Sequence, residues 1–460
     1  MTAQNRLDQE ITDLENLAAD VVSRARKGGA DVAEAIARSG SQLTAKVRLG
    51  EPELVEEAAH RSLGMRVIKQ GRVALTSTSD LTPRGLERFV KDALELVDIS
   101  QEDPFAGPAD PSLLASGPFI DLDLYDEDVG GVTAARAIEL ARRGEQAARS
   151  TDKRITNSEG ATFTRSAGAG AIVLSGGFTG SYAGSSASLV VTPIADDADG
   201  KKRRGHHYTA KRHLEALDAP EDVGREAARR TVRKLGARKV PTCEAPVVFD
   251  PDAARALLGL LSGAVMGSSI WRKSSYLMGR EGSRIASDLV TIVDDPLVPR
   301  APGSRPFDGE GLASRKNMVV RQGILESYLC DSYSARKLSR SSTASASRGG
   351  GGGVGASTSN FMLLPTGTRA TDIIKSTPRG LYVTEMMGFG YNPVTGDFSR
   401  GAAGFWIENG ELAYPVSEVT ISLNLDQLWQ RVDAVGNDLD LRTATASPTL
   451  RVSSMTIAGS

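Results

Sequence analysis

The segment from Glu244 to Ile270 constrains the fold of this chain most strongly, because it reads as a buried strand followed by an apolar helix. The apolar run at 245–249 predicts the strand. Asp250 has the side chain of an N-cap, and Pro251 suits the first position of a helix.

Glycines recur every four residues along this predicted helix, at positions 259, 263 and 267. Residues with this spacing share one face, so we expect another backbone to approach the helix closely there. Each glycine costs about 1 kcal/mol of helix propensity, and tertiary packing has to compensate. The helix contains no histidine, and no carboxylate after Asp252.

Whole-chain properties exclude several classes of protein. The 460 residues carry a net charge of −2, which gives no reason to expect a nucleic-acid partner or a membrane surface. The amino-terminal stretch lacks an apolar signal-peptide run, and no segment of about 18 apolar residues occurs. Cys243 and Cys330 form no CxxC motif, so a disulfide framework is not expected. A reducing cytoplasm is the expected location.

Helix and strand patterns alternate along the chain, which predicts an α+β fold. We expect an N-terminal α/β sandwich-like region, with helices on a mostly antiparallel sheet, followed by a β-rich C-terminal domain. The stretch Ser100–Leu122 is rich in proline, glycine, serine and aspartate and predicts a linker. The predicted domains are an N-terminal α/β segment, a middle segment that completes the N-terminal region, and the C-terminal domain, at residues 1–110, 111–240 and 241–460.

Local patterns predict further elements. Two short strands are expected at 33–38 and 43–49 around a Gly40-Ser41 turn, and three strands of a meander between residues 155 and 191. His60 falls in a charged stretch that reads as helical. A helix is expected over 425–435. The serine- and glycine-rich segment Ser339–Ser359 predicts a flexible stretch.

Motifs for independent catalysis are weak. The four histidines (60, 206, 207 and 213) form no HExxH or HExxxH register, so no metal site and no catalytic residue is predicted. No GxSxG elbow occurs, and the glycine run at 349–353 lacks the GK[ST] ending of a phosphate-binding loop. The basic helix at 225–239 has no aromatic platform beside it and reads as a solvated face.

The most distinctive stretch is Met387–Pro415, which combines turn residues, glycines and polar side chains. Asn409-Gly410 predicts a two-residue hairpin turn. Four polar residues before the hairpin are candidates for substrate binding: Asn392, Asp397, Ser399 and Arg400. The residues alone leave two interpretations open, a glycine-rich hairpin of the core or a channel wall that grips an extended peptide by strand addition.

Four long stretches together resemble the TldD/TldE (PmbA) metallopeptidase family: 61–83, 157–189, 392–425 with its NPVTGDFSRGAAGFWIENGELAYP run, and 448–460. The family has two kinds of subunit. The TldD kind carries a zinc-binding HExxxH helix, whereas the TldE/PmbA kind lacks it and pairs with TldD. At the matching helix this chain reads LLGLLSGAVMGS, and no cysteine follows Cys330. The resemblance is therefore to the TldE/PmbA kind.

The resemblance implies a non-catalytic subunit that needs no cofactor of its own, since zinc would lie in a TldD-type partner. The complex would process or degrade unfolded or extended peptides, including leader removal from ribosomally made precursors. One alternative is a stand-alone peptide-binding or scaffold homodimer without a peptidase role. Another is a divergent peptidase that uses His206, His207 or His213. The family's old label as a gyrase modulator suggests a link to DNA, but no residue pattern here supports nucleic-acid binding.

Overall fold

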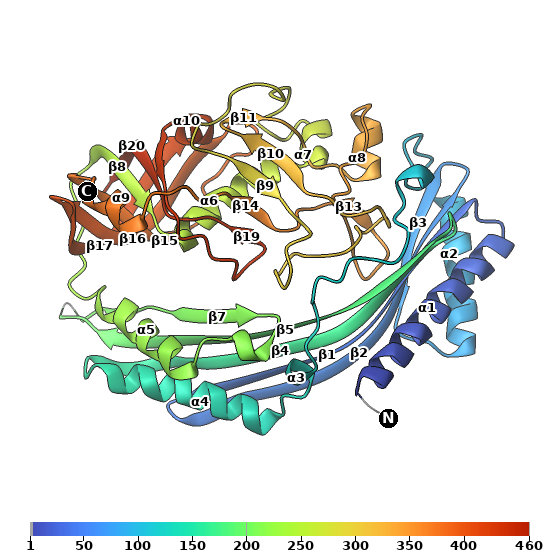
Figure 1. Ribbon diagram of the computed structural model, residues 1–460, viewed down its shortest axis with the longest axis horizontal. Helices are drawn as coiled ribbons and strands as arrows, with labels where there is room; N and C mark the ends of the chain where they lie inside the picture. Colours follow the sequence, from blue (N-terminus) through green and yellow to red (C-terminus); the bar gives the residue numbers. More distant parts are fainter. Residues whose placement is uncertain (1–2, 199, 460) are drawn as a thin grey trace.

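The computed structural model describes residues 3–198 and 200–459, and it consists of a long curved sheet beneath a second, mostly β-structured body (Figure 1). The first sheet has the strand order β3-β2-β1-β4-β5-β6, and β7 also pairs with β5. All of its pairings are antiparallel. Its strands are β1 Val32–Arg48, β2 Glu51–Lys69, β3 Arg72–Thr78, β4 Ile155–Leu174, β5 Phe178–Asp196, β6 Lys202–Arg204 and β7 His207–Lys211.

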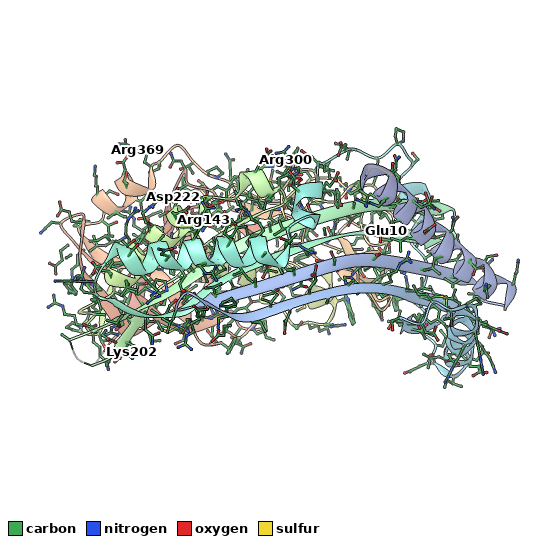
Figure 2. The ribbon with its side chains drawn as sticks, turned by 90° about the horizontal axis from the view of Figure 1, so that it is seen from below. Glu10, Arg143, Lys202, Asp222, Arg300 and Arg369 are labelled. Atoms are coloured by element: carbon green, nitrogen blue, oxygen red, sulfur yellow. The ribbon has the colours of Figure 1, made fainter. Side chains whose placement is uncertain are left out.

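Helices cover the outer face of this sheet, two towards each end (Figures 1 and 2). The described helices before residue 240 are α1 Ala3–Lys27, α2 Pro83–Ile99, α3 Glu127–Gly130, α4 Ala134–Thr151 and α5 Pro220–Val232. Side chains alternate along the strands, so that Ala35 and Ala37 pack under α1 and α2 while Leu43 and Ala45 pack under α4 and α5. The opposite, inner face of the sheet is turned towards the second body.

Three local predictions for this region are wrong. Residues 33–48 form one strand rather than two, because Gly40 pairs with both neighbouring strands instead of turning. Residues 155–174 likewise form one strand, so the predicted meander is a single long hairpin of β4 and β5. His60 lies in β2 and not in a helix, because its stretch pairs along the whole of β1.

The second body contains three smaller sheets, with orders β17-β16-β15-β8-β20-β18, β11-β10-β9-β14-β19 and β12-β13. In the first of these β17 also pairs with β20. The strands are β8 Cys243–Phe249, β9 Ile292–Asp294, β10 Asn317–Arg321, β11 Ile324–Leu325, β12 Ala346–Arg348, β13 Val354–Ala356, β14 Phe361–Leu363, β15 Arg379–Met387, β16 Asp397–Glu408, β17 Glu411–Asn424, β18 Val432–Val435, β19 Thr445–Ala446 and β20 Leu450–Ala458.

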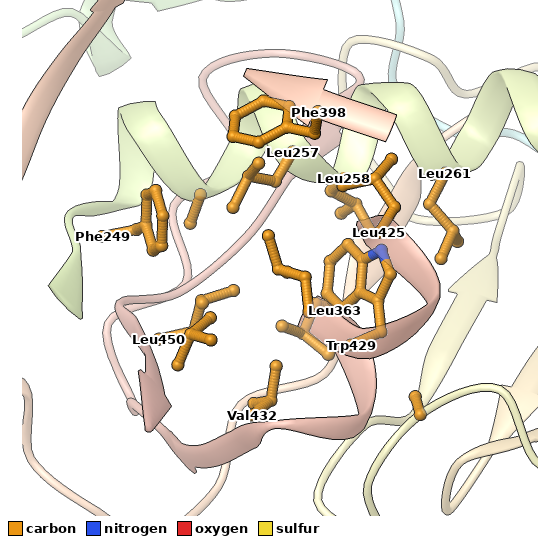
Figure 3. Close-up of a cluster of buried hydrophobic side chains, with 14 of the residues drawn as sticks. Phe249, Leu257, Leu258, Leu261, Leu363, Phe398, Leu425, Trp429, Val432 and Leu450 are labelled. Atoms are coloured by element: carbon orange, nitrogen blue, oxygen red, sulfur yellow. The ribbon is translucent and has the colours of Figure 1, made fainter. Parts of the chain in front are cut away.

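Five helices accompany these strands in the described chain: α6 Pro251–Ala264, α7 Gly267–Trp271, α8 Ser332–Lys337, α9 Ala370–Lys375 and α10 Leu425–Gln430. The buried side chains of α6 meet those of α10 and β8, with Leu257, Leu258 and Trp429 fully enclosed (Figure 3). The predicted helix at 425–435 is shorter, because the chain turns into β18 at Val432. The predicted turn at Asn409-Gly410 is confirmed, with both residues at positive φ between β16 and β17.

The prediction of a flexible segment at Ser339–Ser359 is wrong. It forms the β12–β13 hairpin, and Ser345, Arg348 and Ser359 are buried. Glycine is needed at Gly352, where a Cβ would lie 2.7 Å from the backbone carbon of Met65, and at Gly64 of β2, where it would lie 2.2 Å from the carbonyl oxygen of Gly350. A low-complexity composition here therefore reflects close backbone packing rather than disorder.

The stretch Ser100–Leu122 is irregular and lies between the two bodies. Its Ala115 amide donates to the carbonyl of Gly311, and the Arg336 guanidinium donates to the carbonyl of Pro108. The predicted α+β class, with helices on an antiparallel sheet and a β-rich C-terminal region, is confirmed. Within the described ranges no helix has the length and apolarity required to span a membrane.

Candidate functional site: a cleft between the two bodies

A cavity of about 640 Å³ lies between the inner face of the long sheet and the loops of the second body. The floor comes from β1, β4 and β5 at the middle of the sheet, and the opposite wall from residues 302–309 and the β12 strand. Figure 1 shows this face of the sheet turned towards the second body. The cleft is therefore built by segments more than a hundred residues apart in sequence.

Small residues make the floor flat. Gly40 of β1 pairs with Gly168 of β4, which pairs with Gly184 of β5. A Cβ on Gly168 would lie 2.3 Å from the carbonyl oxygen of Ser39, so glycine is required for the strands to approach here. Next to this row, the Ser166 and Ser186 hydroxyls share a hydrogen bond of 2.9 Å. Along this row the floor offers backbone and small polar groups, while Arg38, His60 and Tyr182 supply larger side chains from the same sheet.

A buried charge cluster fixes the opposite wall to the sheet. The Arg348 guanidinium of β12 lies 2.6 Å from the Glu34 carboxylate of β1, and Arg66 of β2 lies 3.1 Å from the same oxygen. Burial on its own raises the pKa of Glu34, but Arg348 and Arg66 together hold it below its usual value. Glu34 thus stays ionised at neutral pH, and the cluster joins the two bodies beside the cleft.

Aromatic rings close one side of the cleft. The Phe307 ring lies 5.4 Å from that of Tyr182 and 5.1 Å from that of Phe178, both edge-on, and 4.9 Å from Phe119. Edge-to-face pairs at these separations are favourable beyond the area they bury. Tyr182 remains partly exposed and lines the cleft with Phe307.

Helix α6 departs from its sequence prediction in two ways. It ends at Ala264, and the chain restarts as α7 at Gly267. The expected close backbone approach is wrong for Gly259 and Gly263, because a Cβ at either position would meet nothing within 4 Å. At Gly267 it is correct, since the Gly267 amide donates to the carbonyl oxygen of Leu329 at 2.7 Å, and a Cβ would lie 3.2 Å from that oxygen. The Asp250 cap is confirmed, with its carboxylate 2.8 Å from the Ala253 amide.

The residues of α6 do not fit a zinc site. Its carboxylates lie only at the start, where Asp250 caps the helix and Asp252 lies among the guanidiniums of Arg230 and Arg255. Burial raises the pKa of Asp250 to about 7. Across residues 3–198 and 200–459, no group of three His, Cys, Asp or Glu side chains is placed to hold a metal ion.

The histidines lie in different environments. His60 lines the cleft from β2. Burial lowers the pKa of His207 to about 4 and also lowers that of His206. The His213 ring lies 3.2 Å from the Asp123 carboxylate, in an interaction that fixes the start of a loop. None of these arrangements, within the described chain, pairs a histidine with a nucleophile.

The four sequence-predicted binding residues lie together at the start of β16, and none of them lines the cleft. Asn392 accepts a hydrogen bond from the Val394 amide, and Asp397 accepts from Asn424. Asn392, Asp397 and Ser399 are exposed and Arg400 is half-buried. Their role in substrate binding stays a prediction.

The cleft residues themselves were missed by sequence reasoning. Arg38 lies in β1, Arg212 directly after β7 and Arg305 in a loop of the second body, and only the packing of the two bodies brings them to one cleft. The one available signal was the alternation of glycine and serine with branched residues in β4 and β5. That pattern indicated strands but did not indicate which face would meet the second body.

Comparison with known proteins assigns the fold to a class of metallopeptidases. Three family models match in sequence order: PmbA/TldA metallopeptidase domain 1, the central domain and the C-terminal domain, at residues 33–97, 127–235 and 242–459. The chain belongs to the PmbA/TldD family.

Two curated relatives span nearly the whole chain. Metalloprotease PmbA of Escherichia coli O157:H7 is 40% identical over 94% of this chain and 93% of its own length. A PmbA homolog from Haemophilus influenzae is 35% identical over 98% of both chains. Among solved structures, a Bacteroides thetaiotaomicron protein proposed to modulate DNA gyrase is 28% identical, with a TM-score of 0.91 over 97% of this chain and 99% of that one. TldE from Thermococcus kodakarensis, at 22% identity, shares the fold with a TM-score of 0.85 over 96% of this chain and all of its own, 100%.

Proposed function

We propose that this chain is the non-catalytic, TldE-type subunit of a TldD/TldE metallopeptidase and that its cleft forms part of the substrate channel. The observation that supports this proposal most strongly is that the chain has a cleft for a peptide but a helix α6 without metal ligands. A cleft of about 640 Å³ with a flat floor is present, while the central helix α6 offers only apolar side chains, glycines and a serine beyond Arg255. The chain can therefore hold a peptide but lacks the groups that activate water for hydrolysis.

Zinc would be supplied by the TldD-type partner, and this chain would hold and orient the peptide substrate. Backbone groups and serine hydroxyls of the floor would hold an extended peptide, and the narrow cleft would reject folded proteins. Unfolded peptides, including the leaders of ribosomally made precursors, are the substrates this arrangement suits. The exposed turn with Asn392, Asp397, Ser399 and Arg400 would form a second part of the channel wall.

Exposed apolar side chains near that turn suit a protein partner. Phe389 is 96% exposed, and Met387 and Val394 are exposed beside it in sequence. Both cysteines are free thiols, which agrees with a cytoplasmic location. The alternative is a homodimer that acts without a partner.

Mixing this chain with a TldD-type subunit from the same source is expected to give a heterodimer that hydrolyses an unfolded peptide. Ser186→Trp, which fills the exposed floor of the cleft, should slow this hydrolysis severalfold by occlusion. Ser150→Trp on the outer helix α4 is the matched control and should have no effect. The readouts are mass by light scattering and the rate of peptide cleavage.

A stable homodimer that does not exchange with the TldD-type subunit and adds no activity would contradict the proposal and favour the scaffold alternative. Equal activity of the Ser186→Trp and wild-type mixtures would contradict the role of the cleft.

A further inference from the structure

The cleft carries an excess of positive charge that the rest of the chain does not share. Arginines enter it from the sheet and from the opposite wall, whereas Asp308 is the one carboxylate among its described lining residues. The whole chain has a net charge of −2. Cations are therefore concentrated at the cleft.

Three of these arginines have no carboxylate within ion-pair distance among the described residues. Arg38 donates to the carbonyl oxygen of Arg348 at 2.6 Å. Arg212 donates to three carbonyl oxygens, of Ala301, Ser185 and Pro302. Carbonyl oxygens orient a guanidinium but do not neutralise its charge. By contrast, Arg348 and Arg442 are paired with acids.

Of the three arginines, Arg305 has the fewest side-chain hydrogen bonds to the described part of the chain. Its Nε and Nη2 atoms are sealed from solvent and have no hydrogen-bond partner in the part of the chain that the structure describes. An unmade hydrogen bond to a buried charged group is costly, and such donors are normally satisfied by protein groups or ordered water, so the two open donors of Arg305 call for an explanation. Arg305 lines the cleft, so a rotation of its side chain would bring these donors within reach of a ligand there.

Asp308 compensates for this charge only in part: the charge of Arg305 opposes the rise that burial causes in the pKa of Asp308, as it does for the buried Asp294. Its two carboxylate oxygens accept hydrogen bonds from the amides of Glu310, Leu312 and Ala346, at 2.8, 3.0 and 3.0 Å. These bonds hold the loop that forms the wall. The carboxylate is thus committed to its own backbone, and it is only 1% exposed.

We propose that the cleft selects anionic peptide segments, whose aspartate or glutamate side chains are held by Arg38, Arg212 and Arg305. This inference rests on the proposed function and deepens it by naming the substrate class. Guanidinium groups match carboxylates in geometry and are weakly hydrated, so they suit such recognition. The flat glycine and serine floor accepts the peptide backbone while the arginines read its side chains.

A peptide fits this cleft better than a nucleic acid. Nucleic-acid binding needs an extended basic surface that neutralises many phosphates, and here the cations are confined to one recess of a chain with net negative charge. Among the described Phe, Tyr and Trp residues of the cleft, only Tyr182 is exposed, and a single ring does not make a platform for stacked bases.

The test is direct binding by the full chain alone, measured by fluorescence anisotropy with labelled peptides of equal length. One peptide carries glutamates, one carries glutamines at the same positions and one carries lysines. The glutamate peptide is expected to bind about tenfold more tightly than the glutamine peptide, and its advantage should shrink as salt is raised. Binding of the lysine peptide should be the weakest.

Arg38→Gln and Arg305→Gln should each lower the affinity for the glutamate peptide about five- to tenfold and leave the glutamine peptide nearly unaffected. Arg88→Gln on α2, whose side chain is 83% exposed, is the matched control and should change neither. Circular dichroism of both cleft variants checks that they fold, and two separate variants keep the test valid if one does not.

Equal affinity for the glutamate and glutamine peptides would overturn the inference, as would equal effects of Arg38→Gln and Arg88→Gln. Tighter binding of a single-stranded oligonucleotide than of the glutamate peptide would overturn the choice of a peptide. The assay needs no partner subunit, so its failure is distinguishable from a failure to form an active complex. A mixture that cleaves neutral and acidic peptides equally well would leave the proposed function intact and refute only the selectivity.

Discussion

Replacing Glu34 with alanine is expected to lower the free energy of unfolding by about 3–5 kcal/mol. The side chain is 2% exposed and is shared by the guanidiniums of Arg66 and Arg348. Its removal leaves two buried cations without an acid, which costs far more than the pairing itself contributes. Because Arg348 belongs to the second body, the loss should also loosen the wall of the cleft.

The measurement is chemical denaturation of the variant and of a matched control, Glu53→Ala. Glu53 forms ion pairs with Lys46 and Arg48 at the exposed end of the same sheet. Pairs between exposed groups contribute little to stability, because solvent and salt screen them. A loss at Glu34 no larger than that at Glu53 would show that the buried cluster does not hold the two bodies together. Replacing all three buried charges with apolar residues should recover much of the lost stability.

Glu310 is expected to lower the stability as the pH rises from about 5 to about 8, whereas His206 and His207, whose pKa values burial lowers, act in the opposite direction below about pH 6.5. Burial raises the pKa of Glu310 to about 7, and the neighbouring Asp308 adds to the shift. In the unfolded chain the group has its ordinary value near 4.5. Between these two values the folded state binds more protons than the unfolded state, so raising the pH favours unfolding. At about 1.4 kcal/mol per pKa unit, the contribution approaches about 3 kcal/mol.

Glu310→Gln removes this titration while keeping an oxygen for the Ser332 amide, which donates to Glu310 at 2.8 Å. The variant should be more stable than the wild type at pH 8 by about 1–3 kcal/mol and similar to it near pH 5. Burial also raises the pKa of Asp250 and Asp294, so some pH dependence should remain in the variant. Parallel stability profiles for variant and wild type, from urea denaturation across this range, would contradict the assignment.

Local chemistry was predictable from the sequence where a few neighbouring residues decide it. The Asp250 cap and the Asn409-Gly410 turn depend on adjacent backbone geometry alone, and both are confirmed. The long strands were not predictable in the same way. Gly40 reads as a turn residue, but it is held in β1 by pairing with His60 on one side and Gly168 on the other. Pairing with strands that are distant in sequence outweighs the local preference of glycine for a turn.

The same limit applies to the cleft and to the glycine-rich segment. Residues 349–353 lack apolar side chains and so read as flexible, yet Gly352 lies against the backbone of Met65. On α6 the error runs the other way, because Gly259 and Gly263 have the spacing of a packing face but are open. In each case the outcome depends on whether a distant segment packs against the residue, which composition and periodicity do not encode.

The most direct test of the central claim is the zinc content of the purified chain together with its peptidase activity in the absence of any partner. The proposed role predicts no stoichiometric zinc and no chelator-sensitive hydrolysis by the chain alone, because α6 carries no histidine and its acids are committed to the cap and to arginines. One bound zinc per chain, accompanied by hydrolysis that a chelator abolishes, would contradict it and would place a catalytic site within this chain.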